Sequence, residues 1–329
     1  MVRVERSPDP PAEWVSLCEQ DARASMFLHP RWMKAITRAY PRFRPTYLVA
    51  REATEVVGLI PLVKTARMGA RQYISMPFGS HGGPLLAPGA DPGVASALAE
   101  GFRGLGMRLR TMRFEMSVFD PPVGLREAIR PALGSTFHDF RTHIADLSPG
   151  FDELWENGYR RGTRKCVRSA RRAGVVVKIE EPAEAVEVLH RLHSKQSQGW
   201  MGIHAHAREV LKSLIESYRE DARIYVARMG EKPLAACLFL YHQGKEVHPW
   251  VSGAAPEGRE SRAFHLLIHD AMRDACEAGF TFWNFGGSGG NPDIEFFKES
   301  FAASPRPVLR CFHMPGWARR LRKQPAWDR

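Results

Sequence analysis

A run of basic residues near the middle of the chain has the composition of an anion-binding helix. It extends from Arg160 to Gly174 without an acidic residue, and the glycine at its end would stop a helix. Four of its arginines recur at helical spacing and are expected to share one face: Arg164, Arg168, Arg171 and Arg172. Because guanidinium groups bind phosphate and carboxylate oxygens bidentately, the segment predicts an anion site, with a solvated helix face as the alternative.

A glycine-rich stretch follows in the last third of the chain. It runs from Asn284 to Asn291, contains Gly286, Gly287 and Ser288, and leads into a helix opened by Pro292. Backbone N–H groups in such a loop can donate to an anion or to a polarised carbonyl oxygen. The stretch lacks the Lys-Ser/Thr pair of a phosphate-binding P-loop and does not match the dinucleotide-binding fingerprint. A plain flexible loop is the alternative.

A third segment, from His248 to Ala254, ends a predicted strand with an aromatic and a hydroxyl side chain. Trp250 and Ser252 could line a cleft there, and core packing is the alternative. His265 and His269 lie four positions apart and could share a metal on a helix, but no zinc-ligand pattern surrounds them. We therefore expect buried or surface histidines and no metal site.

The overall charge favours polyanionic partners. The formal net charge is +11 and the sequence pI is about 9.7, which suits phosphorylated small molecules, RNA or anionic lipid. The five cysteines have no C-x-x-C spacing, so we expect reduced thiols rather than disulfides. The N-terminal segment has no apolar signal core, and no apolar run reaches the ~20 residues of a membrane span. We expect a cytoplasmic protein.

The last residues, 316–329, form a basic tail. Four cations lie between Trp317 and Trp327, namely Arg319, Arg320, Arg322 and Lys323. Such a tail could contact an anionic membrane or RNA. A tail without a partner is the alternative.

A strand–turn–strand pattern occurs once in each half of the chain. In the first half, Val49–Arg51 precedes a polar turn and Val56–Ile60; in the second, Val226–Arg228 precedes a turn of equal length and Pro233–Cys237. The two copies are 177 positions apart, and an amphipathic helix precedes each. A duplicated domain is the simplest explanation, and chance similarity of two hairpins is the alternative.

Helices and strands alternate along both halves, which predicts an α/β fold with a mixed α+β sheet. Polar, proline and glycine residues cluster at 146–150 and mark the boundary. We expect an N-terminal domain over 1–147, a C-terminal domain carrying the main site over 148–315, and the tail over 316–329.

Three motifs together resemble those of the Fem-like transferases and their relatives with a duplicated GNAT-type acetyltransferase fold. The first, around Phe27, His29, Pro30 and Trp32, has the form F-x-H-P-x-W. The second is the basic helix R-K-x-x-R-x-A-x-x-x-G, and the third is the closing F-G-G-S and F-K-x-S-F pair. The resemblance covers nearly the whole chain and implies two tandem GNAT-like domains.

The resemblance also implies roles for individual residues. Lys298 and Phe297 would lie at the reaction centre, with Lys298 as the catalytic residue. Arg164 and Arg168 would hold a phosphorylated acceptor, and the other substrate-binding residues would be Trp250, Ser252, Gly286, Gly287 and Ser288. The segment from Gly258 to His265 lacks the glycine-rich pyrophosphate turn of GNAT enzymes, which weighs against CoA binding in the standard way.

The function implied is N-acyl transfer from acyl-CoA or aminoacyl-tRNA, bound as a co-substrate rather than as a tight cofactor, to an amine of a cell-envelope precursor. Direct attack by the amine is the simplest route, with Asp293, Glu295 and His248 as candidate bases. No DNA partner is expected. The alternatives are an inactive accessory protein of polysaccharide or envelope biosynthesis and an RNA-binding protein.

Overall fold

The computed structural model describes residues 2–21, 24–67, 69–107, 111–119, 121, 123–133, 137–198 and 205–313, so the basic tail lies outside the described residues. The chain divides into two compact units. The first contains the residues up to Arg141 together with the segment that begins at Pro307, and the second contains Thr142–Arg306. No described helix is long and apolar enough to span a bilayer.

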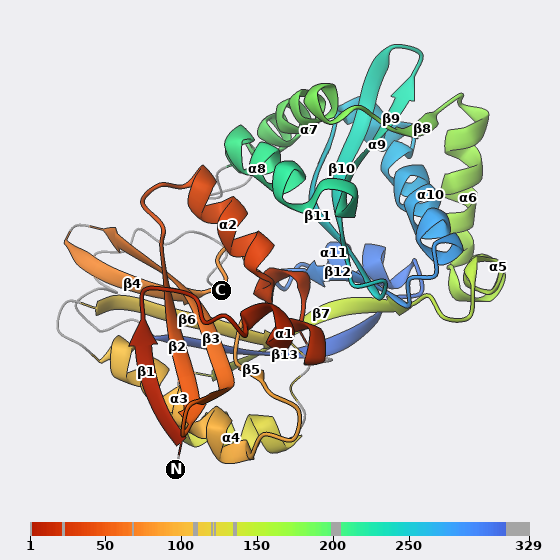
Figure 1. The fold of residues 1–329 in the computed structure, drawn as a ribbon. Helices are drawn as coiled ribbons and strands as arrows, with labels where there is room; N and C mark the ends of the chain where they lie inside the picture. Colours follow the sequence, from red (N-terminus) through yellow and green to blue (C-terminus); the bar gives the residue numbers. More distant parts are fainter. Residues whose placement is uncertain are drawn as a thin grey trace. The chain divides into compact units, whose positions relative to one another are not determined.

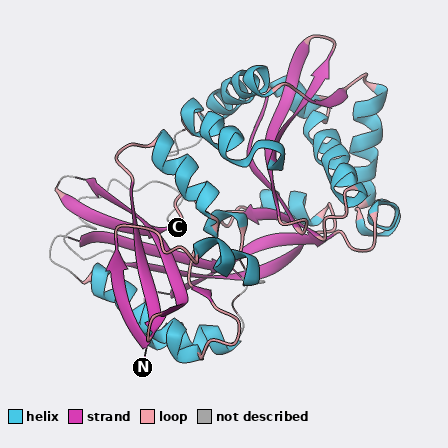
Figure 2. Ribbon diagram, in the orientation of Figure 1, coloured by secondary structure: helices cyan, strands magenta, loops and turns pink. Residues whose placement is uncertain are grey.

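The first unit is a mixed sheet with helices packed on it (Figures 1 and 2). Its strands follow the order β1-β2-β3-β4-β6-β13, with β5 paired to β3. The strands are β1 (Val2–Ser7), β2 (Arg44–Glu52), β3 (Glu55–Arg67), β4 (Ala70–Ser75), β5 (Leu85–Leu86), β6 (Thr111–Phe119) and β13 (Ser304–His313). The helices are α1 (Trp14–Gln20), η1 (Met26–Leu28), α2 (Pro30–Ala39), α3 (Pro92–Gly106) and α4 (Val123–Leu133).

The second unit has the same kind of mixed sheet, in the order β7-β12-β11-β10-β9-β8. Its strands are β7 (Phe137–Asp146), β8 (Val176–Ile179), β9 (Ala222–Met229), β10 (Lys232–His242), β11 (Glu246–Ala254) and β12 (Phe282–Gly287). Its helices are α5 (Phe151–Glu153), the π-helical turn η2 (Leu154–Gly158), α6 (Arg161–Arg172), α7 (Pro182–Ser197), α8 (Arg208–Tyr218), η3 (Arg219–Asp221), α9 (Pro256–Glu260), α10 (Ala263–Glu277) and α11 (Pro292–Glu299). Figure 1 shows α7 and α8 on one face of the sheet and α6 and α10 on the other.

Each unit buries its own core. In the first, Phe102 of α3 meets Phe114 of β6 edge to face at 5.2 Å, among the aliphatic side chains of the sheet. In the second, Trp283 of β12 packs on Phe239 of β10 at 5.2 Å, and α10 covers this layer with its apolar face. Burial of this kind is the main source of folding free energy, so each half of the sequence has a core of its own.

The predicted repeat is present in the structure. The first copy is the hairpin of β2 and β3 after helix α2, and the second is the hairpin of β9 and β10 after helix α8. Ala53 and Gly230 occupy equivalent turn positions, 177 residues apart, and both have positive φ values (50° and 55°). The same helix–strand–strand unit therefore occurs in both halves.

Strands β11 and β12 are parallel but diverge early. Among the described residues they pair only at Glu246–Phe282 and Val247–Trp283, whereas β11 continues to Ala254. Beyond the paired residues, the His248 side chain of β11 lies against Gly286 of β12. The ends of parallel strands are where α/β sheets commonly bind ligands.

The last strand, β13, joins the sheet of the first unit. It pairs with β6 over Val308–His313, and the first unit accordingly includes the chain from Pro307 onward. The division expected from the sequence is continuous along the chain and assigns these residues to the C-terminal domain. Sequence periodicity carries no information about which strand a late segment pairs with, so it could not indicate the pairing with β6.

Candidate functional site

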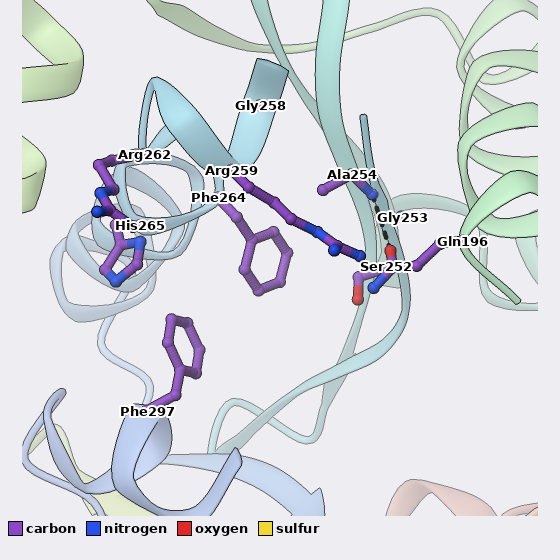
Figure 3. Close-up of a pocket in the computed structure, with 10 residues that line it drawn as sticks. All are labelled: Gln196, Ser252, Gly253, Ala254, Gly258, Arg259, Arg262, Phe264, His265 and Phe297. Atoms are coloured by element: carbon purple, nitrogen blue, oxygen red, sulfur yellow. Dashed lines mark hydrogen bonds between the residues drawn. The ribbon is translucent and has the colours of Figure 1, made fainter. Parts of the chain in front are cut away.

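A pocket of about 320 Å³ lies in the second unit, where β11 ends and α10 begins (Figure 3). Its lining comes from α7, β11, the α9–α10 segment and α11. The lining residues are Gln196, Ser252, Gly253, Ala254, Gly258, Arg259, Arg262, Phe264, His265 and Phe297. A concave site with a few polar groups among aromatic side chains is typical of a small-molecule site.

The end of β11 is fixed in place by helix α7. The side-chain oxygen of Gln196 accepts a hydrogen bond from Ala254 N at 2.9 Å, as drawn in Figure 3. Gly253 is needed for the close approach, because a Cβ there would lie 2.4 Å from the backbone N of His193. His193 in turn contacts the carbonyl oxygen of Ser252 through Nδ1 at 2.8 Å. The strand end that lines the pocket is therefore rigid.

The N-terminus of α10 faces the same pocket and carries no side-chain cap. Arg262 occupies the N-cap position in the left-handed conformation, with φ 60°, and no side chain accepts from the first-turn N–H groups. Arg259 and Arg262 both line the pocket beside this helix end. Uncapped N–H groups and the helix dipole favour an anion, and two guanidinium groups add to that preference.

Gly258 has a packing role. A Cβ at this position would lie 2.1 Å from the carbonyl oxygen of Leu234, so α9 can sit against β10 only with glycine here. Where the sequence lacks the glycine-rich pyrophosphate turn, the structure has the short helix α9, which carries Arg259, followed by Arg262 at the N-cap of α10. The structure offers side-chain cations where that turn would offer backbone donors.

Aromatic rings form the other side of the pocket. Phe297 of α11 stacks on Phe264 at 5.8 Å and meets His265 edge to face at 5.2 Å. Burial lowers the pKa of His265 to about 4, and the neighbouring Arg262 adds to this effect. His265 is therefore neutral at physiological pH and can donate or accept one hydrogen bond at each ring nitrogen.

Lys298 follows Phe297 and is buried, with 6% of its surface exposed. Its Nζ donates to the carbonyl oxygens of Gly286 and Gly287, each at 2.8 Å. Burial lowers the pKa of Lys298 to about 7, partly offset by Glu295. A neutral amine has two N–H groups, which these carbonyls occupy, and a lone pair that remains available; the ammonium form has a third N–H instead.

The buried side chain of Asn284 holds the glycine-rich loop through hydrogen bonds. Its side-chain oxygen accepts from Gly286 N at 3.0 Å and from Thr142 Oγ1 at 2.8 Å, and its amide donates to Glu246 at 2.8 Å. All of Asn284 is buried. The loop therefore presents carbonyl oxygens to Lys298, whereas the sequence predicts N–H donors here and the Gly286 N–H is already occupied.

The structure brings some of the predicted residues together. Ser252 and Phe297 both line the pocket, whereas Lys298 lies beside Phe297 in the chain and contacts the glycine loop instead. Trp250 packs against His206, with ring centroids 4.7 Å apart. Ser288 is buried, and its hydroxyl has no hydrogen-bond partner within the described chain.

The candidate bases have different surroundings. Asp293 is exposed in the first turn of α11, where Asn291 caps the helix as predicted. Glu295 is half-buried near Lys298. His248 is buried, with its Cε1 3.2 Å from the position of a Cβ built on Gly286.

The arginines of the basic helix have structural partners of their own. Arg164 donates through Nη1 to three backbone carbonyls of the η2 region, those of Trp155 at 3.0 Å, Tyr159 at 3.2 Å and Glu156. The Arg168 guanidinium lies over the Trp155 ring at 5.5 Å. Neither residue lines the pocket. Their predicted contact with a phosphorylated acceptor stays a prediction.

Residues to which the sequence assigned no role in the site include Gln196, Arg259 and Asn284. Gln196 and Arg259 belong to segments with no motif, and only the fold brings them to the end of β11. Asn284 stands at the start of the glycine-rich loop, and its burial beside Glu246 follows from the early divergence of β11 and β12.

Comparison with known proteins places this site in a family context. Residues 157–299 match the acetyltransferase (GNAT) domain family. The crystal structure of FemX is similar to this chain, with 12% sequence identity and a TM-score of 0.69. The match covers 97% of this chain and 100% of the FemX chain. A tandem GNAT protein from the clavulanic acid biosynthesis pathway is similar at 13% identity and a TM-score of 0.56. That match covers 96% of this chain and 100% of the other chain. A DUF2156 domain from Agrobacterium fabrum is similar at 13% identity and a TM-score of 0.58. That match covers 93% of this chain and 94% of the other chain.

At these identities the structural likenesses concern the fold, and they confirm the predicted tandem GNAT-like architecture. No curated protein sequence matches the chain.

Proposed function

We propose, from the match of residues 157–299 to the GNAT acetyltransferase domain family, that the protein transfers an acyl or aminoacyl group from an activated donor to an amine. The observation that carries the proposal is the pocket itself. It combines an uncapped helix N-terminus, two arginines and the Phe297 ring that precedes Lys298. An activated acyl donor has an anionic carrier and an apolar or amide-bearing arm, and these surroundings suit both.

The donor would place its anionic portion against Arg259, Arg262 and the start of α10. The reactive carbonyl would then lie toward Phe297 and Ser252. Acyl-CoA is the donor that the charge of the pocket favours, since its pyrophosphate could contact the uncapped N–H groups of α10 and an arginine of the lining. Aminoacyl-tRNA offers phosphates as well, and the experiment below separates the two.

Lys298 would manage the proton of the acceptor amine. The amine nitrogen attacks the donor carbonyl and forms the new C–N bond, and the bond from carbonyl carbon to the leaving sulfur or oxygen breaks. Neutral Lys298 can accept the amine proton through its lone pair and return it to the leaving group, which balances the reaction. A pKa of about 7 gives Lys298 both forms near neutral pH.

The acceptor is proposed to be an amine on a phosphorylated cell-envelope precursor. Trp250, Arg164 and Arg168 are the candidate residues for holding it. Arg168 keeps an exposed guanidinium, whereas Arg164 would have to serve the acceptor while it also binds the η2 carbonyls. Of the two, Arg168 is therefore the better candidate for contact with a phosphate.

The test is thermal unfolding of the protein with CoA and acetyl-CoA, and with charged and uncharged tRNA. A ligand that binds only the native state raises the unfolding midpoint by mass action. We expect CoA species to raise it. In the double variant Arg259→Gln/Arg262→Gln, loss of two charge-assisted contacts should raise the apparent Kd for CoA by about 10–100-fold.

The matched control is Arg191→Gln/Lys212→Gln, which removes two exposed cations of the second unit away from the pocket. Equal weakening in both double variants would mean that net charge alone attracts CoA. A shift only with charged tRNA would assign the donor to aminoacyl-tRNA. No shift with any of the four would favour an accessory protein that retains the fold without the reaction.

A further inference from the structure

Helix α6 carries a row of cations on its outward side, and the proposed reaction assigns a role to only one of them, Arg168. The helix buries Thr163, Val167 and Ala170, which define its inner face. Four exposed cations lie at intervals of four, three and four residues: Arg161, Lys165, Arg168 and Arg172. At ~100° per residue these four point nearly opposite the buried face. We call them the α6 stripe.

The stripe differs from the face expected from the sequence. Of the four arginines predicted to act together, Arg164 binds backbone carbonyls of η2, and Arg171 forms an ion pair with Asp270 at 3.0 Å. Both therefore turn toward neighbouring elements. Arg168 and Arg172 remain on the outward side, where Arg161 and Lys165 join them.

Among the described residues, no Asp or Glu forms an ion pair with any of the four members of the stripe, and the sequence has no acidic residue between Glu156 and Glu180. Arg168 also contacts the Trp155 ring. Four like charges spread over ~16 Å of helix repel one another, so a polyanionic surface beside them would relieve a cost that the fold carries.

The stripe lies on the outside of the second unit. Helix α6 packs on α10, and Figure 1 shows α10 between α6 and the sheet. The four side chains of the stripe point away from the core, so they can all contact one flat surface at the same time. The geometry therefore suits an extended partner better than a small ligand in a cavity.

An exposed aromatic side chain, Phe296 of α11, adjoins the N-terminal end of α6 and is 58% exposed. Arg160 links α11 to the start of α6: its N–H donates to Ser300 O at 3.0 Å, and its guanidinium lies 4.5 Å from the centre of the Phe296 ring and pairs with Glu299 at 3.0 Å. A row of cations beside an exposed aromatic ring is the composition of a membrane-interface surface.

We propose that the α6 stripe, with Phe296 beside its N-terminal end, is a docking surface for an anionic lipid membrane. The cations bind the lipid phosphates, and the Phe296 ring enters the headgroup region. RNA is less suited to this surface, because α6 has no aromatic side chain to stack on a base and no Asn or Gln to read one. This inference does not depend on the transfer reaction.

The test is co-sedimentation of the whole protein with vesicles of equimolar phosphatidylglycerol and phosphatidylcholine, and with vesicles of phosphatidylcholine alone. We expect binding only to the anionic vesicles. Each cation near an anionic surface contributes roughly a fivefold gain in partitioning. The variant Arg161→Gln/Lys165→Gln/Arg172→Gln should therefore lose on the order of 100-fold in partitioning.

The matched control is Arg191→Gln/Lys212→Gln/Lys232→Gln, which removes the same charge from exposed positions elsewhere in the second unit. It should keep most of the binding. A third variant, Phe296→Ser, should retain binding at low salt and lose the part that resists high salt, because apolar insertion is not screened.

Equal losses of vesicle binding in the stripe variant and its control would overturn the proposal, because net charge alone would then explain the binding. So would vesicle binding that is unchanged in the stripe variant. Binding of tRNA that falls in the stripe variant while vesicle binding does not would assign the stripe to nucleic acid instead. Circular dichroism of each variant confirms that a loss of binding is not a loss of fold.

Discussion

At the scale of single residues, the protonation of Lys298 is the feature with the clearest physical consequence. Its ammonium is buried, and burial lowers the pKa from 10.5 to about 7. The two carbonyl oxygens of Gly286 and Gly287 lie 2.8 Å from Nζ and replace part of the lost hydration. A lysine that serves only as a loop clamp gains nothing from a low pKa, whereas a proton carrier requires one.

This leads to a prediction for Lys298→Met. Between pH 7 and 10.5 the unfolded wild type keeps the lysine proton while the folded state has lost it, so raising the pH stabilises the wild type. Relative to the variant, the wild type should gain up to about 1.4 kcal/mol in unfolding free energy per pH unit in this window. Urea unfolding of both proteins at several pH values measures the difference.

The control is Lys212→Met, which removes an exposed lysine that pairs with Glu187. A difference between wild type and Lys298→Met that stays constant from pH 7 to pH 10 would show that Lys298 is charged in the folded protein. The role as a proton carrier would then fail, and the clamp of the glycine loop would remain.

The sequence located this residue but not its surroundings. Lys298 and Phe297 stand in a recognisable motif, and both lie at or beside the pocket. The arginines of the pocket were not predicted, because Arg259 and Arg262 have no periodic pattern and gain meaning only where α10 begins. A glycine-rich turn is the common solution for binding pyrophosphate, whereas this chain places side-chain cations in that segment.

At the scale of elements, the basic helix shows how a linear pattern divides once the helix packs. Helical spacing predicts that four arginines share one face of the helix. In the structure, one of them contacts η2 and another contacts α10. Arg164 turns to the η2 carbonyls and Arg171 to Asp270. The existence of the helix was predictable from sequence, whereas the partners of its side chains depend on η2, a π-helical turn with no sequence signal.

The η2 turn gives the second prediction of this section. A π-helical turn leaves carbonyl oxygens poorly satisfied, and Arg164 binds three of them. Arg164→Ala removes a charged donor from these groups and should lower the free energy of unfolding by about 1–3 kcal/mol. Arg164→Lys can restore one contact and should recover only part of the loss.

Lys165→Ala is the matched control, one position along the same helix and exposed. It should change stability by less than about 0.5 kcal/mol. Urea unfolding measures all three variants. An Arg164→Ala protein as stable as the wild type would mean that water satisfies the η2 carbonyls equally well, and Arg164 would then be available for an acceptor phosphate.

At the scale of the whole molecule, both units contain histidines held neutral by burial. In the first unit, His81 stacks on Phe119 at 5.0 Å and burial lowers its pKa to about 4. In the second, burial lowers the pKa of His206 and His265 to about 4 and that of His269 to about 3. The duplicated architecture could be predicted from the 177-residue repeat, whereas the sequence left open whether His265 and His269 are buried or at the surface, because a histidine carries no periodic signal of its own.

These histidines predict acid sensitivity. Above pH 6.5 neither the folded nor the unfolded state protonates them; as the pH falls below 6.5 the unfolded state takes up protons that the folded state excludes. Stability is therefore lost as the pH falls toward 4, by up to about 1.4 kcal/mol per pH unit for each histidine. Urea unfolding of the wild type from pH 7 to pH 5 should show this fall.

Replacement by phenylalanine isolates the effect in each unit. His269 lies among Phe151, Trp155 and Tyr159, with the Trp155 ring 4.6 Å away, and His81 lies between Phe119 and Phe27, so an aromatic ring fits both sites. His269→Phe and His81→Phe should each lose less stability than the wild type between pH 7 and pH 5, by about 1 kcal/mol or more. If one variant follows the wild-type curve, that histidine is protonated in the folded unit, which would require an acceptor or water beside it. Two variants that each flatten the curve would show that burial, rather than a specific partner, sets the acid limit in both halves.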